Sequence, residues 1–250
     1  MAQPPQPPQP PPHPKITVVV PTYNEAENVP ELLRRIMALE LPRLEVLFVD
    51  DGSPDGTADL AERLSGEYGG RVRVLRRARK LGLGAAYVAG FTEAVQAGAD
   101  LVVEMDADLS HAPEYLPAMV SMMDRYDVVV GSRWTAGGGV DPSWGLARRL
   151  LSRGGSLYAG LVLGLRLADT TTGFKCFRRE ALERVDLARI RSQGFVFQIE
   201  MAYACQRQGL RVAELPIRFA SRARGQSKMS LKIVVEALWR VLAIRVRPGG

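Results

Sequence analysis

The sequence predicts an α/β protein with a mostly parallel β-sheet and helices on both faces of the sheet. Short apolar, β-branched segments alternate with segments of helical periodicity as far as Gly131. Two of the apolar segments end directly in carboxylates, which is where open α/β sheets bind their ligands. The 250 residues, 46% of them hydrophobic, suffice for one large domain or two small ones.

The elements before Gly131 follow from the spacing of apolar residues. Asn24 is the expected N-cap of the first helix, and a glycine-rich turn is expected to begin the third. The expected strands are 16–20, 44–49, 72–75, 100–105 and 128–130. The expected helices are 25–39, 56–68, 84–97 and 113–126.

Beyond Gly131 the alternation of strands and helices stops. The three glycines 137–139 indicate a mobile loop, and 220–228 is a basic loop rich in Gly and Ser. Helices are expected at 146–163, 195–208 and 231–246, with a strand at 211–219.

Three parts of the chain differ in composition. Residues 1–14 contain eight prolines and are expected to form a disordered or polyproline-II-like tail, which is either a spacer from a membrane partner or an unimportant extension. Residues 15–229 form the expected catalytic domain. Residues 230–250 hold an amphipathic helix, which either lies at a membrane interface or packs on the domain.

The chain is basic, with a net charge of +6 and a pI of about 9.6. Clusters of Lys and Arg suit a polyphosphate, an anionic lipid or a nucleic acid, although solvated basic faces are the plain alternative. The clusters comprise Arg71, Arg73, Arg76, Arg77, Arg79 and Lys80, then Arg148, Arg149 and Arg153, then Arg222, Arg224 and Lys228.

The two cysteines, Cys176 and Cys205, lack the spacing of a metal site and lie in apolar segments. We expect reduced core thiols, in keeping with a cytosolic protein. The N-terminus has no apolar segment of the kind found in signal peptides, and no window has the roughly 18–20 apolar residues of a membrane span.

The most informative motif is Asp106-Ala-Asp108, which follows the expected strand 100–105. Strand alternation directs both carboxylates to one side, so both can reach one Mg²⁺ or Mn²⁺ ion. Such an ion would stabilise charge on a leaving diphosphate. The alternative is a pair of turn carboxylates without a metal.

A second set of residues suits a nucleotide. Tyr23 and Glu25 follow the first strand, where a ring can stack on a base and a carboxylate can bond a ribose. Asp51 ends the second strand and is a candidate for the edge of the base. The segment Gly82-Leu-Gly84 lacks the third glycine of a dinucleotide fingerprint, which argues against a dehydrogenase but permits a helix N-terminus near a diphosphate.

Two further candidate residues come shortly after expected strands. Arg133 follows the strand 128–130, and its planar guanidinium suits a phosphate. His111 follows the acidic pair and is either a group behind the metal ligands or a helix-start residue.

Four motifs together resemble those of glycosyltransferase family 2, and within it the polyprenol-phosphate (dolichol-phosphate) mannose synthases. They are Pro21-Thr-Tyr-Asn-Glu25, Val49-Asp-Asp-Gly-Ser-Pro-Asp-Gly56, Asp106-Ala-Asp-Leu-Ser-His111 and Gly131-Ser-Arg133. Three later segments extend the resemblance to about residue 230: Asp169-Thr-Thr-Thr-Gly-Phe174, Gly194-Phe-Val-Phe-Gln-Ile-Glu200 and Arg222-Ala-Arg-Gly-Gln-Ser-Lys228.

The resemblance implies a GT-A fold and inverting transfer of mannose from GDP-mannose to a polyprenyl monophosphate. The roles that it implies fall on the following residues. By this resemblance, the guanosine is bound by Pro21, Tyr23, Glu25, Val49 and Asp51. The metal is bound by Asp106 and Asp108, and the backbone of Ala107 also contacts the sugar nucleotide. The donor phosphates are bound by Arg133, Arg222 and Lys228, and the acceptor phosphate is bound by Arg133, Arg148 and Ser152.

No general base is evident in the sequence, and the reaction hardly needs one. A phosphate monoester has a second pKa near ~6, so it is largely a dianion at neutral pH and a competent nucleophile. The chemical task is to bring two polyanions together, which a metal and arginines achieve by neutralising and positioning them. Asp108 and Arg133 are the expected catalytic residues.

Two other functions fit parts of the pattern. A synthase that uses UDP-glucose would share the fold and the metal site. A non-catalytic nucleotide- or RNA-binding module would suit the pI, but carboxylates among the arginines would repel a nucleic-acid backbone. The expected location is cytoplasmic and peripheral to the membrane, reached through the C-terminal helix and the apolar segment 157–165 or through a separate membrane-anchoring protein.

Overall fold

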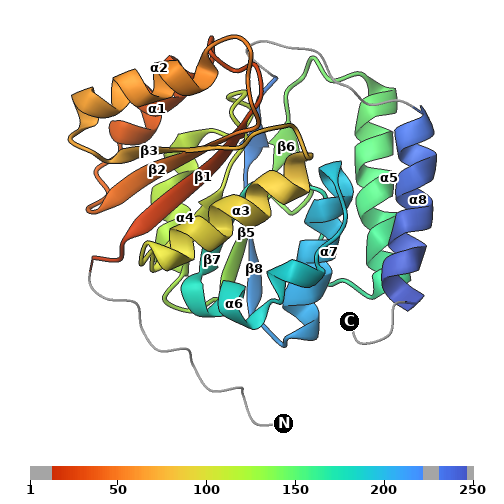
Figure 1. The fold of residues 1–250 in the computed structure, drawn as a ribbon. Helices are drawn as coiled ribbons and strands as arrows, with labels where there is room; N and C mark the ends of the chain where they lie inside the picture. The colour runs from red at the N-terminus through yellow and green to blue at the C-terminus, as the bar shows by residue number, and fades with distance from the viewer. Residues whose placement is uncertain (1–12, 222–230, 247–250) are drawn as a thin grey trace.

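The computed structural model describes residues 13–221 and 231–246. Its centre is a sheet of seven strands in the order β3-β2-β1-β4-β7-β5-β8, which runs through the molecule in Figure 1. The strands are β1 (Ile16–Thr22), β2 (Leu44–Asp50), β3 (Val72–Arg76), β4 (Leu101–Glu104), β5 (Val128–Ser132), β7 (Lys175–Arg178) and β8 (Val212–Pro216). The expected α/β class and mostly parallel sheet are confirmed.

One strand runs against all the others. β7 lies between β4 and β5 and is antiparallel to both, whereas the remaining neighbours in the sheet are parallel. It therefore begins at the edge where β4 and β5 end. The segment that leads into β7 is brought to the carboxyl edge of the sheet, beside the residues that follow β4 and β5.

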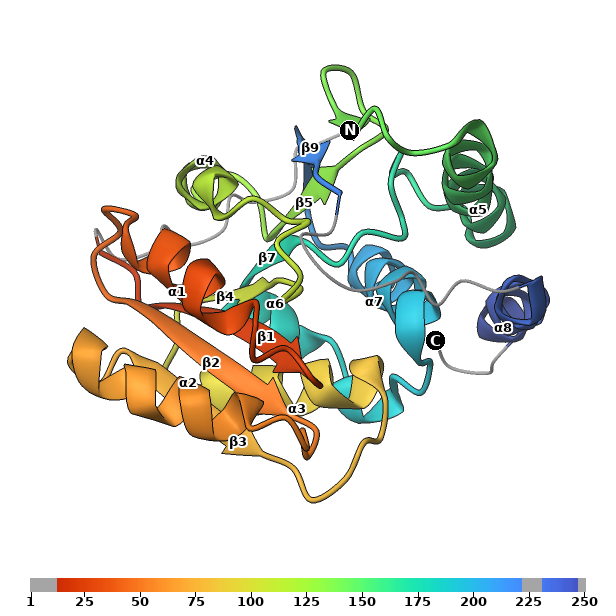
Figure 2. The same ribbon diagram turned by 90° about the horizontal axis from the view of Figure 1, so that it is seen from above.

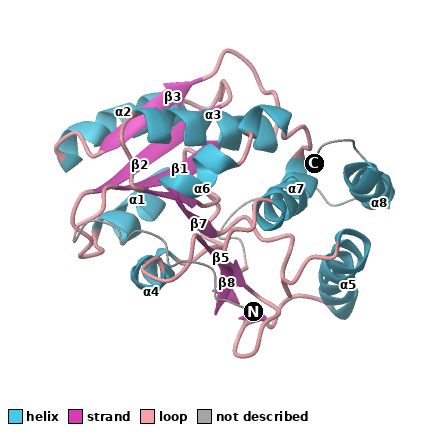
Figure 3. Cartoon of the chain, turned by 90° about the horizontal axis from the view of Figure 1, so that it is seen from below, coloured by secondary structure: helices cyan, strands magenta, loops and turns pink. Residues whose placement is uncertain are grey.

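Helices cover both faces of the sheet, as Figure 3 shows. The helices on one face are α1 (Val29–Met37), α2 (Thr57–Ser65) and α4 (Leu116–Met122). The helices on the other face are α3 (Leu83–Gln96), α6 (Arg179–Arg184) and α7 (Gly194–Arg207). Strand alternation divides the core accordingly, because Val18 and Val20 belong to the first face and Val19 belongs to the second.

Two further helices lie outside these layers. α5 (Leu146–Leu163) and α8 (Leu231–Val246) lie side by side at one end of the molecule, next to α7 (Figures 1 and 2). Ala159 and Leu163 of α5 pack with Val241 and Ile244 of α8 in a third apolar cluster. Both helices have the expected bounds.

Some expected elements differ from the structure. The first helix begins later than expected, with Asn28 as its N-cap, because Asn24 has a left-handed φ of 61° that no helix residue adopts. The expected helix 113–126 is a 3-10 turn, Pro113–Tyr115, followed by the shorter α4. Residue 139 of the expected glycine loop begins β6 (Gly139–Val140), which pairs with β9 (Arg218–Phe219).

The expectation for the cysteines is confirmed. Cys176 and Cys205 are free and buried, and burial raises the pKa of each thiol to about 12. Among the described residues, no helix combines the length and the apolar character needed to cross a bilayer. Most of the proline-rich tail lies outside the described residues.

The packing of α3 on β1 and β2 requires a glycine at position 90. A Cβ there would overlap the Val19 side chain and lie 2.9 Å from Val49 Cγ2. We expect Gly90→Ala to destabilise the protein by about 1–3 kcal/mol despite the better helix propensity of Ala. The control is Gly154→Ala in α5, where a Cβ meets no atom within 4 Å and we expect about 0.5–1 kcal/mol of stabilisation. Urea unfolding measures both, and equal effects of the two changes would refute this packing.

Candidate active site

Asp106 and Asp108 directly follow β4 at the carboxyl edge of the sheet, as expected. Asp106 Oδ1 accepts a hydrogen bond of 2.9 Å from the hydroxyl of Tyr87, which lies on α3. Asp108 Oδ1 accepts hydrogen bonds from the Ser110 backbone nitrogen (3.1 Å) and hydroxyl (2.5 Å). Neighbouring groups therefore fix the rotamer of each carboxylate before any ligand arrives.

His111 supports this turn from behind. Its ring is buried against Phe174, with 5.1 Å between ring centroids, and Nδ1 accepts a hydrogen bond of 3.2 Å from the Asp106 backbone nitrogen. Burial lowers the pKa of His111, so the neutral ring with its proton on Nε2 is favoured. Of the two interpretations from the sequence, the group behind the acidic pair matches this position.

A buried polar cluster lies next to Asp106. It consists of Glu104 on β4, Lys175 on β7 and Gln198 on α7, each 2% exposed or less. The Gln198 amide donates to Glu104 Oε1 and accepts from Lys175 Nζ, while Lys175 also donates to the Thr172 carbonyl over 2.6 Å. Burial raises the pKa of Glu104 to about 7, against the opposing pull of Lys175.

Arg133 directly follows β5, and its guanidinium is held by a carboxylate. Nε and Nη2 donate to the two oxygens of Asp169 over 2.6 and 2.7 Å, and the Arg133 backbone nitrogen donates to Asp169 over 3.0 Å. Nη2 also donates to Thr171 Oγ1 over 2.8 Å. The phosphate role expected of Arg133 therefore applies to an arginine whose orientation Asp169 has already set.

Arg148 and Ser152 share a stripe of α5 with Ser156, because residues four apart lie on one side of a helix. Ser156 is buried and lies 3.5 Å from Thr171 Oγ1, the partner of Arg133. The Arg148 guanidinium lies 3.6 Å from the centroid of the Trp144 ring. The stripe expected to receive the acceptor phosphate thus adjoins the Arg133 network.

The residues expected to hold a nucleoside gather at the ends of β1 and β2. Lys80 Nζ lies 3.6 Å from the centroid of the Tyr23 ring. Asp51 forms an ion pair of 2.7 Å with Arg77, and both side chains are largely buried. The remaining expected residues lie nearby in the sequence: Pro21 in β1, Glu25 bonded to Asn28, and Val49 buried in β2.

Three of the six residues in the first basic cluster of the sequence, Arg73, Arg76 and Arg77, are paired with carboxylates. Arg73 lies 2.8 Å from Glu93, and Arg76 lies 2.5 and 2.7 Å from Asp59 and Glu62. This pairing reduces the positive charge that the cluster could offer to a nucleic-acid backbone.

The glycines of the rejected dinucleotide fingerprint have a packing role. A Cβ on Gly84 would lie 2.5 Å from the Ser192 carbonyl and 2.9 Å from the Phe197 ring, so the start of α3 packs closely on the segment before α7. Gly82 precedes the helix with a left-handed φ of 100°. Arg222 and Lys228, expected to hold the donor phosphates, lie outside the described residues.

The acidic pair suits a divalent cation that shares its coordination with phosphate. Within the residues 13–221 and 231–246, no group of three acidic, His or Cys side chains could hold a metal. Two carboxylates with the remaining positions left to phosphate oxygens and water is the usual Mg²⁺ arrangement.

Comparison with known protein families identifies the family of this chain. The family model described as glycosyl transferase family 2 matches residues 17–186. The chain belongs to this family. The expected family and its GT-A fold are both confirmed.

Two curated relatives are similar over almost their whole length. The chain is 44% identical to an undecaprenyl-phosphate mannosyltransferase of Micrococcus luteus, over 91% of this chain and 92% of the relative. It is 41% identical to a polyprenol monophosphomannose synthase of Mycolicibacterium smegmatis, over 94% and 89%.

Solved structures share the fold at lower identity. Glucosyl-3-phosphoglycerate synthase of Mycobacterium tuberculosis, in complex with Mn²⁺, UDP and phosphoglyceric acid, matches 95% of this chain and 80% of its own with a TM-score of 0.67 at 19% identity. The same enzyme in complex with Mn²⁺, UDP and glucosyl-3-phosphoglycerate matches with a TM-score of 0.64.

Sequence reasoning did not assign individual roles to several residues of this glycosyltransferase site. Tyr87 lies in an apolar helix, where the sequence pattern indicates a buried core residue and not a site residue. Asp169 and Gln198 belong to the motifs 169–174 and 194–200, from which no individual role was predicted for either residue. Both side chains are polar and are buried in the structure, and buried polar side chains are uncommon unless they are paired.

The Arg133–Asp169 pair predicts a specific pH dependence. Burial alone would raise the pKa of Asp169, but the hydrogen bonds and charge of Arg133 lower it overall. The ionised carboxylate therefore stabilises the fold above its ordinary pKa of 3.8, and this contribution is lost as the pH falls from there through the lowered pKa. We expect Asp169→Asn to cost about 3–5 kcal/mol at pH 7 and less at pH 3.

Urea unfolding of the unaltered protein and of Asp169→Asn, each at pH 7 and at pH 3, tests this expectation. Asp186→Asn is the control, because Asp186 pairs with Arg189 on the surface and we expect little change in stability. An equal cost of Asp169→Asn at pH 7 and pH 3 would contradict the assignment.

Proposed function

We propose that this protein is an inverting, metal-dependent mannosyltransferase that transfers mannose from GDP-mannose to a polyprenyl monophosphate. The observation that carries the proposal is the placement of Asp106 and Asp108 at the same sheet edge as Arg133 and the Arg148 stripe. This edge offers carboxylates for a metal beside cations for a second phosphate. The two mannosyltransferase relatives, which match about nine-tenths of the chain, support the choice of sugar and lipid.

In the proposed reaction, Asp106 and Asp108 hold a Mg²⁺ or Mn²⁺ ion. When bound, the ion supplies Lewis-acid stabilisation of the negative charge on the leaving diphosphate. Tyr87 and Ser110 keep the two carboxylates oriented, so little reorganisation accompanies binding. Tyr23 provides an aromatic face for the base, and Arg77 orients the Asp51 carboxylate toward its edge.

The acceptor phosphate binds between Arg133, Arg148 and Ser152 in this proposal. Arg148 lies on an exposed part of α5, where a lipid phosphate can reach it, and Ser152 lies one turn further along the same stripe. A dianionic phosphate attacks the anomeric carbon without a general base. A single displacement then inverts the anomeric centre and gives a β-linked mannosyl phosphate from an α-linked donor.

The test is a transfer assay with labelled GDP-mannose and a short polyprenyl phosphate in detergent. We expect mannosyl lipid that EDTA abolishes and Mg²⁺ or Mn²⁺ restores. The double change Asp106→Asn/Asp108→Asn should reduce turnover on the order of 100-fold or more, because it removes the metal ligands. Asp124→Asn, at an exposed carboxylate, is the control.

Two outcomes would correct the proposal. Product from UDP-glucose alone would keep the metal site but change the donor. Full activity of the double variant would exclude Asp106 and Asp108 as the metal site.

We further propose that the outer faces of α5 and α8 bind the surface of an anionic membrane. Ten large apolar side chains are exposed in the described part of the chain, and nine of them lie on these two helices. They are Leu146, Leu150, Leu151, Leu157 and Leu161 on α5, and Leu238, Trp239, Leu242 and Val246 on α8.

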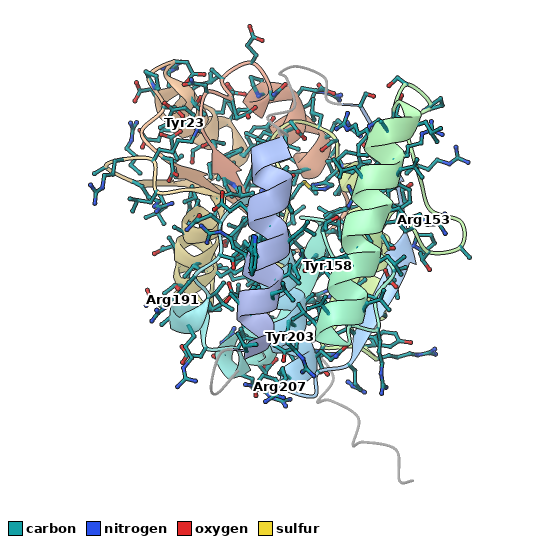
Figure 4. All side chains as sticks on the ribbon, turned by 90° about the vertical axis from the view of Figure 1, so that its right-hand side faces the viewer. Tyr23, Arg153, Tyr158, Arg191, Tyr203 and Arg207 are labelled. Atoms are coloured by element: carbon teal, nitrogen blue, oxygen red, sulfur yellow. The ribbon has the colours of Figure 1, made fainter. Side chains whose placement is uncertain are left out.

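The arrangement of these side chains favours lipid over water. At 100° per residue, Leu146, Leu150, Leu157 and Leu161 fall within one 60° arc, opposite the buried Ala159 and Leu163. Leu238, Leu242 and Val246 likewise fall within one 80° arc of α8, on the side away from the buried Ile244. Figure 4 shows the two helices side by side on one face, with Arg153 and Tyr158 along α5.

Charge selects an anionic membrane as the partner. α5 contains Arg148, Arg149 and Arg153 and no acidic residue. Of these, Arg149 and Arg153 flank the leucine arc, where arginines attract anionic headgroups while leucines and a tryptophan enter the interface. Docking there brings α5 to the headgroup region, with the acceptor stripe on the side of the helix turned toward the domain.

Vesicle flotation tests this surface. We expect the protein to bind phosphatidylglycerol-containing vesicles, and Leu157→Gln/Leu161→Gln to weaken that binding about tenfold or more because both side chains lose their apolar contact. Leu81→Gln is the matched control, since Leu81 is exposed but lies outside α5 and α8. No vesicle binding by the unaltered protein would overturn the proposal in favour of a membrane-protein partner.

A further inference from the structure

The buried cluster of Glu104, Lys175 and Gln198 has no role in the chemistry described so far. Glu104 and Lys175 face each other across the β4–β7 ladder, 3.5 Å apart, and Gln198 bridges them from α7. All three lie on the side of the sheet covered by α3 and α7. Glu104 precedes Asp106 by two residues, so the cluster lies directly beneath the candidate metal site.

We propose that Lys175 and Gln198 are positioning residues that set the spacing between the Asp106 carboxylate and the Arg133 guanidinium. The proposal rests on the proposed function, because it takes Asp106 as a metal ligand and Arg133 as a phosphate ligand. It assigns to these two buried side chains a part in binding the metal-bound nucleotide.

Hydrogen bonds link the cluster to Arg133 through the segment before β7. Lys175 Nζ donates to the Thr172 carbonyl over 2.6 Å and so fixes the segment that leads into β7. That segment carries Asp169, which holds Arg133 by three hydrogen bonds, and Thr171, which holds it by a fourth. A shift of Thr172 would move the residues that orient Arg133.

Gly173 links the cluster to Asp106. Gly173 lies between the two parts of the site: a Cβ there would be 3.2 Å from Gln198 Nε2 and 3.5 Å from Asp106 Oδ1. The Gly173 backbone thus lies beside both the Asp106 carboxylate and the Gln198 amide. Gln198 therefore limits how closely the segment carrying Asp169 approaches Asp106.

Burial of the charged pair costs desolvation free energy. A buried ion pair is often no more stabilising than apolar residues of the same volume, since both charges lose their hydration. The surrounding positions on this face are apolar, including Val102, Phe177 and Phe197. A polar cluster at the one place where β4, β7 and α7 meet beneath Asp106 fits a demand for orientation better than a demand for stability.

The experiment must separate positioning from folding. Lys175→Met alone leaves Glu104 without its cation and is expected to destabilise the protein. The double variant Glu104→Gln/Lys175→Met removes both charges, so it is expected to keep a melting temperature near that of the unaltered chain. Gln198→Leu is a second variant, which keeps the ion pair and removes only the bridge.

The readout is Mn²⁺-dependent binding of GDP, measured by isothermal titration calorimetry without any turnover. We expect the Mn²⁺ concentration for half-maximal binding to rise about tenfold or more in the double variant and in Gln198→Leu, the range seen when groups that orient metal ligands are removed. Cys205→Ala is the control, because Cys205 is buried on the same helix and its loss lowers stability while keeping the hydrogen bonds that join Glu104, Lys175 and Gln198.

Other outcomes decide against the proposal or against its premise. An unchanged Mn²⁺ requirement in both folded variants would overturn the positioning role. A native chain that binds UDP with Mn²⁺ in place of GDP would correct the proposed donor, and the same titration with UDP would then test the cluster. A native chain that binds neither nucleotide with Mn²⁺ would refute the metal site and the positioning role together.

Discussion

The reversed strand β7 is the constraint on which the site depends. A sheet of parallel strands alone would bring only strand ends to its carboxyl edge, whereas β7 starts there and brings in the chain that precedes it. That chain supplies Asp169 and Thr171 to Arg133, and β7 itself begins with Lys175 of the cluster beneath Asp106. The two neighbouring strands, β4 and β5, supply Asp106 and Arg133 themselves. The site therefore joins residues that follow parallel strands to residues that precede an antiparallel one.

The parts that sequence reasoning predicted well are those governed by local periodicity. The bounds of α5 and α8 follow from apolar spacing, and the five early strands follow from β-branched segments that end in turn residues. The position of the acidic pair at the carboxyl edge was predicted because the pair follows an apolar, strand-like segment. β7 was missed, because the four residues from Lys175 to Arg178 include two basic ones and have no alternating pattern.

The partners of the site residues could not be read from the sequence because they depend on long-range contacts. Arg133 and Asp169 are 36 positions apart, and Glu104 and Gln198 are 94 apart. A basic cluster such as the one at Arg73 and Arg76 reads as an anion-binding surface until the structure shows its carboxylate partners. The roles of individual site residues likewise depend on ligands, which only the binding experiments can supply.

The cluster of Glu104, Lys175 and Gln198 has an evolutionary consequence. Replacement of either charged residue alone creates an unpaired charge in a site that water does not reach, so each single step passes through a less stable chain. Descent with modification is then expected to keep the pair intact or to exchange both members within a short interval. The three positions should vary as a unit among homologous sequences, while the exposed faces of α5 and α8 drift under a looser requirement for apolar character.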